Sequence, residues 1–105
     1  MLDKELVLQA AEQIKKGWCQ INLAQDKDGL SISPYDPSAV KWCVIGAMMK
    51  ISQNRLQRRR LSEKFLEFYS EYLSSYNICQ TTVEPVIERL KEFAPKLEKE
   101  HALNK

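Results

Sequence analysis

Trp42-Cys43-Val44-Ile45-Gly46-Ala47-Met48-Met49 is the most apolar stretch of this chain, and we expect it to decide the fold. It lies within a longer segment, residues 39–51, that carries only two charged side chains. A helix that is apolar around most of its circumference is usually buried on most sides. The segment is therefore predicted to form a central buried helix, with Asp36 as its cap and Pro37 in its first turn.

The Trp42-Cys43 pair has a counterpart earlier in the chain, Trp18-Cys19. Tryptophan and cysteine are among the residues most often withdrawn from solvent, so we interpret both pairs as parts of the core. Trp18 is expected to cover that core and to donate its indole N–H to a carbonyl of the loop that follows. Gly46 costs about 1 kcal/mol relative to alanine inside a helix, which predicts that another element approaches closely there.

Three further helices are predicted around the central one. Apolar residues recur with helical spacing over residues 3–16, and Gly17 is the expected stop. The same periodicity predicts a helix over residues 62–76, which Asn77 would end in a left-handed turn. The last helix is expected to start at residue 81 or 82, and Pro95 to kink or end it.

The fold class that follows is all-α: a single-domain bundle of about four helices over residues 1–97. The irregular region, residues 20–36, is expected to be one long loop or a small hairpin around the Asp28-Gly29 turn. Residues 98–105 are polar and are predicted to be a frayed tail. At 105 residues, the chain has the length of one small domain.

Composition narrows the classes of protein to which the chain can belong. It has no apolar run of about 20 residues, so no membrane association is expected. Its three cysteines are widely and irregularly spaced, which indicates no disulfide framework and favours the reducing cytoplasm. Zinc sites need closely spaced ligand pairs, and His101 is the single histidine, so neither a metal nor a cofactor is predicted.

The net charge of +2 arises from one short segment, because residues 55–64 hold five basic side chains and one acidic one. Clustered arginines can neutralise phosphates of a nucleic acid, and they can equally meet an acidic protein. We take both as candidate roles for this surface and rank protein binding first. The residues concerned are Arg55, Arg58, Arg59 and Arg60.

A tyrosine stripe is a second candidate contact surface, made of Tyr69, Tyr72 and Tyr76. Tyrosine is enriched at protein interfaces because it combines a large apolar area with a polar tip. The leading hypothesis is therefore a small, non-enzymatic protein-interaction or regulatory module that binds a protein partner or itself. A nucleic-acid-associated regulator is the second hypothesis. The third is an enzyme with a site between Cys43 and the loop 20–36, for which no catalytic residues are assigned.

Several short motifs together resemble a domain of unknown function that occurs in short bacterial and bacteriophage proteins. They span residues 17–47 and read Gly17-Trp18-Cys19-Gln20, Ala24-x-Asp26-x-x-Gly29, Pro34, Asp36-Pro37-x-Ala39-Val40 and Trp42-Cys43-x-x-Gly46-Ala47.

The resemblance implies a small helical domain and no particular reaction. It implies structural roles for the signature residues, and the phage members suggest a role in host interaction or host defence. The C-terminal half departs from the family, because Tyr76-Asn77 is followed by neither the aspartate nor the glycine of the family's turn. The signature residues are Gly17, Trp18, Cys19, Asp26, Gly29, Trp42, Cys43 and Gly46.

Overall fold

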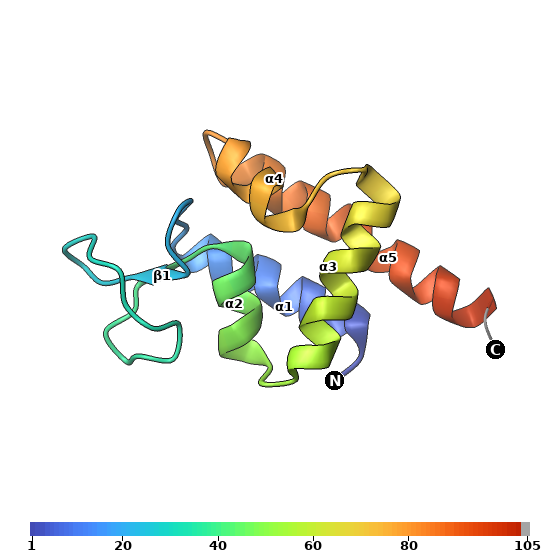
Figure 1. The fold of residues 1–105 in the computed structure, drawn as a ribbon, viewed down its shortest axis with the longest axis horizontal. Coiled ribbons are helices and arrows are strands. Elements are labelled where there is room, and N and C mark those ends of the chain that lie inside the picture. The colour runs from blue at the N-terminus through green and yellow to red at the C-terminus, as the bar shows by residue number, and fades with distance from the viewer. Residues whose placement is uncertain (104–105) are drawn as a thin grey trace.

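A computed structural model describes the backbone of residues 1–103 and the side chains of residues 1–97. Over that part the chain forms five helices and a two-stranded antiparallel sheet, so it is mostly helical, as predicted, without being purely α (Figure 1). The elements are α1 (Asp3–Lys16), β1 (Ala24–Gln25), β2 (Lys41–Trp42), α2 (Val44–Ile51), α3 (Arg55–Tyr69), α4 (Leu73–Cys79) and α5 (Glu84–Leu103).

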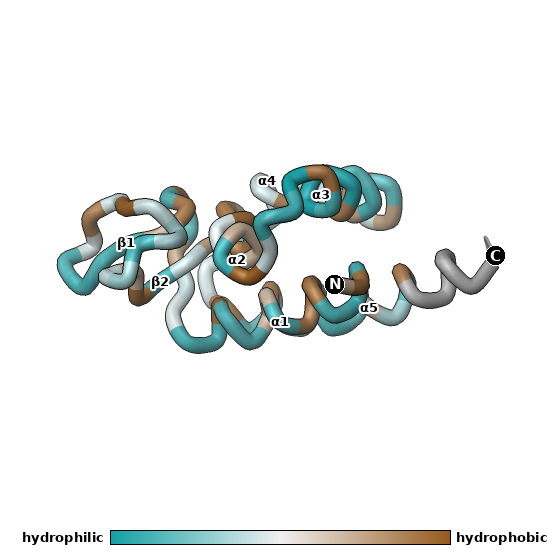
Figure 2. Tube along the Cα trace, turned by 90° about the horizontal axis from the view of Figure 1, so that it is seen from below, coloured by the Kyte–Doolittle hydropathy of each residue, from teal (hydrophilic) through white to brown (hydrophobic). Residues whose placement is uncertain are grey.

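The helices form two layers with α2 between them. Figure 2 shows α1 and α5 along one side and α3 and α4 along the other. Helix α1 packs along α5 and against α2, while α2 also contacts α3 and α4. The sheet and its connecting loops extend from one end of the molecule, beyond the N-terminal end of α2 (Figure 1). This arrangement leaves the 20–40 region with few helical neighbours.

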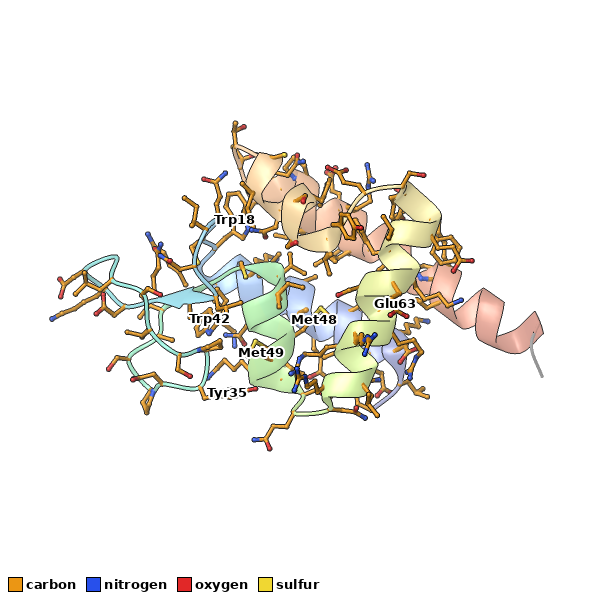
Figure 3. All side chains as sticks on the ribbon, viewed as in Figure 1. Trp18, Tyr35, Trp42, Met48, Met49 and Glu63 are labelled. Atoms are coloured by element: carbon orange, nitrogen blue, oxygen red, sulfur yellow. The ribbon has the colours of Figure 1, made fainter. Side chains whose placement is uncertain are left out.

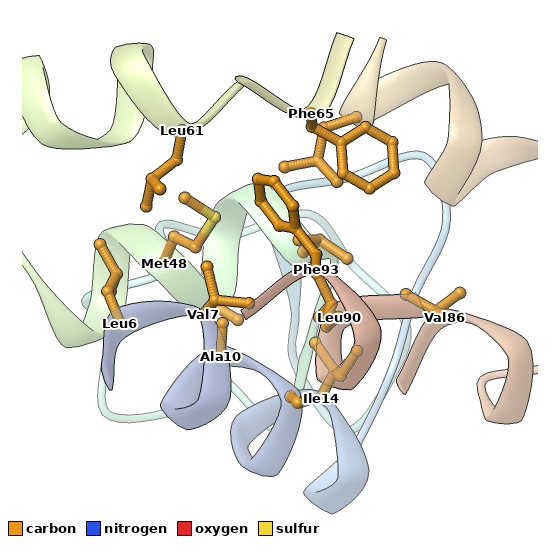
Figure 4. Packing of buried hydrophobic residues seen from close by; sticks show 14 of the residues in the cluster. Leu6, Val7, Ala10, Ile14, Met48, Leu61, Phe65, Val86, Leu90 and Phe93 are labelled. Carbon is orange, nitrogen blue, oxygen red and sulfur yellow. The ribbon is translucent and has the colours of Figure 1, made fainter. Parts of the chain in front are cut away.

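The core fills the space between the two layers (Figure 4). At its centre, the rings of Phe65 from α3 and Phe93 from α5 meet edge to face, with centroids 5.4 Å apart. Each fully buried side chain of this kind contributes roughly 1.5–3 kcal/mol through the area it removes from water. The neighbouring core residues include Leu6, Val7, Ala10 and Ile14 of α1, Met48 of α2, Leu61 of α3, and Val86 and Leu90 of α5.

The first and last helices largely follow the sequence pattern. Helix α1 has the predicted bounds and ends against Gly17, whose N–H donates to the Ile14 carbonyl. Helix α5 begins at Glu84, two residues beyond the later predicted start, and Pro95 lies inside it without ending it. The predicted frayed tail, residues 98–105, lies outside the part whose side chains are described.

The predicted start of the central helix is wrong. Helix α2 begins at Val44, not at Ala39, and its cap is Cys43, whose sulfur accepts a hydrogen bond from the Gly46 N–H at 3.3 Å. Asp36 instead accepts from the N–H of Ser38 in a local turn. Apolar composition alone could not find this boundary, because a buried strand residue and a buried helix residue look alike in sequence.

The predicted third helix is two helices. Helix α3 starts seven residues earlier than predicted, where the Asn54 side chain accepts from the Gln57 N–H, and it ends at Ser70 in the left-handed conformation (φ 54°). After this break the chain forms α4, which holds Asn77 inside it. Asn77 is therefore a buried helical residue and not the predicted helix end.

The close approach predicted at Gly46 is present. A Cβ atom at Gly46 would overlap with the carbonyl oxygen of Leu23, and one at Gly17 would overlap with that of Val40. In both cases the obstacle is backbone, which cannot move aside as the end of a flexible side chain can. The two glycines therefore allow the loop 17–43 to pack directly against α1 and α2.

Replacing Gly46 with alanine is expected to destabilise the protein by more than about 3 kcal/mol, although alanine is the better helix former by about 1 kcal/mol. The physical reason is the overlap with the Leu23 carbonyl, and urea unfolding measures the effect. Gly29→Asn is the matched control, because Gly29 has φ +81° with open space around it and asparagine tolerates that conformation. A Gly46→Ala protein as stable as wild type would contradict this close packing.

Candidate functional site

The segment 17–43 is held together by backbone hydrogen bonds from several directions. Trp42 is central: its N–H donates to the Gly17 carbonyl at 3.0 Å, and its carbonyl accepts from the Cys19 N–H at 3.2 Å. This parallel bridge lies on one side of β2, and the antiparallel pairing with β1 lies on the other. Most of the segment is thus an ordered platform in spite of its loop-like sequence.

The tip of the platform is a hairpin built by Asp26 and Gly29. The Asp26 carboxylate accepts from the N–H groups of Asp28 and Leu30, at 2.9 and 3.0 Å. The backbone N–H of Asp26 donates to the Leu30 carbonyl, which closes the turn, and Gly29 supplies the positive φ. Of the two alternatives predicted for this region, a long loop or a small hairpin, a short hairpin around Asp28-Gly29 is present, with one antiparallel bridge between Gln25 and Ser31. Asp26 has a local structural contact that accounts for its place in the motif.

Asn77 connects the platform to the helices. Its side-chain oxygen accepts from the indole N–H of Trp18 at 2.9 Å and from the N–H of Val44, the first residue of α2, at 3.2 Å. Its amide group donates to the carbonyls of Cys19 and Gln20. The partner of Trp18 is thus this side chain and not the predicted loop carbonyl. The second tryptophan, Trp42, donates its indole N–H to the Pro34 carbonyl. Figure 3 labels both tryptophans.

Cys19 and Cys43, which lie near the two ends of the segment 17–43, are both buried, and Cys79 is exposed. Burial raises the pKa of the Cys19 thiol to about 11, with a smaller contribution from Cys43 in the same direction. Burial likewise raises the pKa of Cys43, against the opposing effect of the N–H groups around its sulfur. Neither thiol is a thiolate at neutral pH, so this arrangement does not activate a cysteine nucleophile.

Two of the four clustered arginines contact other segments of the chain, and three of the four, Arg55, Arg59 and Arg60, are exposed. Arg60 pairs with Asp3 of α1 through two hydrogen bonds, and Arg58 donates to the Ser52 carbonyl in the α2–α3 connection. Arg59 forms an exposed pair with Glu63 one turn away, and Arg55 is exposed. The structure therefore does not gather the four guanidinium groups on one open face.

The three tyrosines of the stripe also differ in their contacts and exposure. Tyr76 is buried and donates its hydroxyl to the Pro85 carbonyl, and Tyr69 bonds to Glu92 of α5. The guanidinium of Arg89 covers both rings, 4.4 Å from the centre of Tyr69 and 5.0 Å from that of Tyr76. Only Tyr72, 65% exposed between α3 and α4, is open to a partner.

Sequence reasoning missed a group of exposed apolar side chains on the platform. Ile21 is 83% and Leu30 is 63% exposed, and three more large apolar residues of the same segment are also open to solvent. The signal was available, because five large apolar residues in a segment without helical period have no obvious core to enter. We call this group the loop surface; it consists of Ile21, Leu23, Leu30, Tyr35 and Val40.

Within the described residues there is neither a metal-binding group of side chains nor a membrane-spanning helix. Among residues 1–97, no group of three or more histidine, cysteine or carboxylate side chains is placed to hold a metal ion. Over the described helices, none is both long and apolar enough to cross a bilayer. The loop surface is therefore the feature of the described chain that most needs a functional explanation.

Comparison with known proteins adds no family to this picture. No family model, no curated protein and no solved structure matches the chain. The resemblance to the bacterial and phage domain thus stays a hypothesis that rests on the motifs of residues 17–47.

Asn77→Ala is expected to destabilise the protein by about 3–5 kcal/mol. The change leaves two buried donors, the Trp18 indole N–H and the Val44 N–H, without this acceptor, and each such group costs about 1–3 kcal/mol. Urea unfolding measures the loss, with Ser74→Ala on the exposed side of α4 as the control. A loss below about 1 kcal/mol would show that Asn77 does not hold the platform to α2.

Alkaline stability is expected to depend on Cys19. Its folded pKa of about 11 lies above the ordinary thiol value of 9, so the folded state keeps a proton that the unfolded chain releases. Stability is therefore complete below pH 9 and falls as the pH rises from 9 to 11. With a reductant present, wild type should lose about 1–2 kcal/mol more over this range than Cys19→Ser. Parallel curves for the two proteins would contradict the assignment.

Proposed function

We propose that this protein is a small interaction module that binds a protein partner through its loop surface. The observation that carries the proposal is the exposure of five large apolar side chains on a segment with an ordered backbone. Ile21 and Leu30 are the most exposed of them. Binding residues are often presented by loops on a stable scaffold. On this proposal the five side chains act together as one contact site.

The backbone of the platform is ordered before any partner arrives, and this favours binding. The Val40 N–H donates to the Gln25 carbonyl, and the Ile32 N–H donates to the Ala24 carbonyl. Separate parts of the segment are therefore hydrogen-bonded to one another. A surface that is ordered before binding loses little conformational entropy when a partner arrives. The loop surface therefore combines apolar area with a low ordering cost.

The charges around the loop surface point to an apolar contact. The segment that carries the loop surface holds three carboxylates, Asp26, Asp28 and Asp36, and two lysines, Lys27 and Lys41, which gives a net charge of −1. Such a small net charge fits a partner surface with an apolar centre and mixed charges at its edge. It gives no reason to expect a highly charged ligand at this face.

Nucleic-acid binding remains a second candidate because Arg55, Arg59 and Arg60 are exposed on α3. Arg60 is paired with Asp3 and Arg59 with Glu63, so these arginines would meet phosphates in competition with carboxylates of the same chain. A nucleic-acid complex would weaken steeply as salt increases, whereas an apolar protein contact would not.

Membership of the bacterial and phage family, a cytoplasmic location and a host-interaction role are further parts of the proposal. The resemblance has one structural argument in its favour. Gly17 lies against Val40, and Trp18 is bridged to Trp42, so residues of the shared motifs pack against one another. Motifs that meet in space are expected where a sequence pattern encodes one local structure.

The proposal is tested with the double variant Ile21→Ser/Leu30→Ser. Both side chains are exposed, so the variant should keep the stability of wild type within about 0.5 kcal/mol. Proteins captured from nuclease-treated lysate by immobilised wild-type protein are identified by mass spectrometry. A partner captured by wild type should be lost, or reduced more than about tenfold, with the loop variant.

Arg55→Ser/Arg59→Ser is the matched control, and it should retain the same partner. If the arginine variant loses the partner while the loop variant keeps it, the contact lies on α3 and the proposal is wrong. A complex that is captured only from lysate without nuclease, or that disappears when the salt concentration is raised, would favour the nucleic-acid alternative instead.

A further inference from the structure

The sheet of the platform has one edge covered by α4 and one edge open to solvent. On one side of β2 lies the segment around Trp18, and Asn77 of α4 donates two hydrogen bonds to carbonyls of that segment. On the far side of β1, Ser31 is bridged to Gln25, and Ser31 is exposed. Figure 1 shows the sheet and its loops at one end of the molecule. The open edge therefore lies where a second molecule could reach it.

The backbone groups of Ser31 face outward from this open edge. The Asp26 N–H donates to the Leu30 carbonyl at 3.0 Å. The Ile32 N–H donates to the Ala24 carbonyl at 3.1 Å. Successive residues of a strand direct their backbone groups to opposite sides, so the N–H and C=O of Ser31 face away from β1. Within the described residues, neither of these two groups has a hydrogen-bond partner.

Residues 30–33 carry none of the usual protections against pairing with another strand. They read Leu30-Ser31-Ile32-Ser33 and hold no charged side chain, and proline follows only at residue 34. Natural sheet edges are commonly blocked by lysine, by proline or by a bulge. Leu30 is 63% exposed, so an apolar side chain lies beside the unpaired backbone. The edge therefore offers both hydrogen bonds and apolar area to a further strand.

The open edge is complementary to a second copy of itself. When two antiparallel strands place the same residue opposite itself, each copy of that residue can donate to the other and accept from it. With Ser31 in that position, Leu30 of one copy lies opposite Ile32 of the other, and both are apolar. This arrangement has two-fold symmetry, and it stops at two molecules because α4 occupies the other edge of the sheet.

We propose that two copies of this chain form a symmetric dimer by pairing residues 30–33 as antiparallel strands. Four residues from each copy make a contact much smaller than a standard protein interface. The association is therefore weak, with a dissociation constant on the order of 100 µM. Leu30 also belongs to the loop surface, so dimerisation would cover part of the area open to another protein. That last consequence rests on the proposed function, whereas the dimer itself does not.

The test uses the purified full chain with a reductant, which prevents disulfide formation at the exposed Cys79. Sedimentation equilibrium between about 10 µM and about 1 mM should show a shift from monomer to dimer. Ser31→Pro should raise the dissociation constant about tenfold or more, because proline has no N–H to donate across the two-fold axis. Proline is tolerated at an edge position whose N–H faces solvent, so this variant should fold.

Ser31→Ala is the matched control. It removes the hydroxyl and keeps the backbone N–H, so it should dimerise like wild type. Hydrogen exchange measured by NMR locates the contact in the unaltered protein. The Ser31 amide should exchange about threefold more slowly at about 1 mM than at about 50 µM, in step with the fraction of dimer. The Ile32 amide should be protected at both concentrations, because it is bonded within the monomer.

Three results would overturn the proposal. The first is a protein that stays monomeric at about 1 mM. The second is a Ser31→Pro protein that folds and dimerises as strongly as wild type. The third is a dimer in which the Ser31 amide exchanges equally fast at both concentrations, since such a dimer would use another surface. Because the protein is pure, these results do not depend on whether a partner is captured from lysate.

Discussion

The backbone of Trp42 is hydrogen-bonded to Gly17 and Cys19 on one side of β2. On its other side β2 pairs with β1. Most other features of the molecule depend on this close backbone packing. It requires glycine at 17 and 46, because a side chain at either position would overlap with a carbonyl group. It also holds residue 42 extended, which forces α2 to begin immediately afterwards at Val44. Four segments distant in sequence thereby meet at the N-terminal end of one short helix.

Such packing buries polar groups that need partners, and Asn77 supplies several of them. One side chain, 1% exposed, satisfies the indole of Trp18, the first N–H of α2 and two carbonyls of the platform. A buried polar residue of this kind stabilises only when its bonds are all made, so it also restricts how α4 can sit against the platform. The aromatic cluster of α3 and α5 contributes most of the apolar burial on the opposite side.

The same packing changes which residues are available for function. Arg58, Arg60, Tyr69 and Tyr76 are engaged in contacts within the chain. The platform, in contrast, pairs much of its own backbone and leaves five large apolar side chains exposed. The surface that is both ordered and apolar therefore lies on the segment without regular helix.

The sequence by itself determined what depends on local pattern: α1 and its glycine stop, the approximate position of α5, the turn at Asp28-Gly29 and the close approach at Gly46. Only the tertiary structure decided that Trp42 is a strand residue, that Cys43 caps α2, and that Asn77 lies inside a helix as a buried acceptor. The physical reason is that periodicity and turn propensity are properties of neighbouring residues. Hydrogen bonds between residues 17 and 42, or 18 and 77, depend on segments that meet only when the chain is folded. For the same reason the sequence indicates which arginines and tyrosines are candidates for binding, but it does not show which of them make contacts within the folded chain.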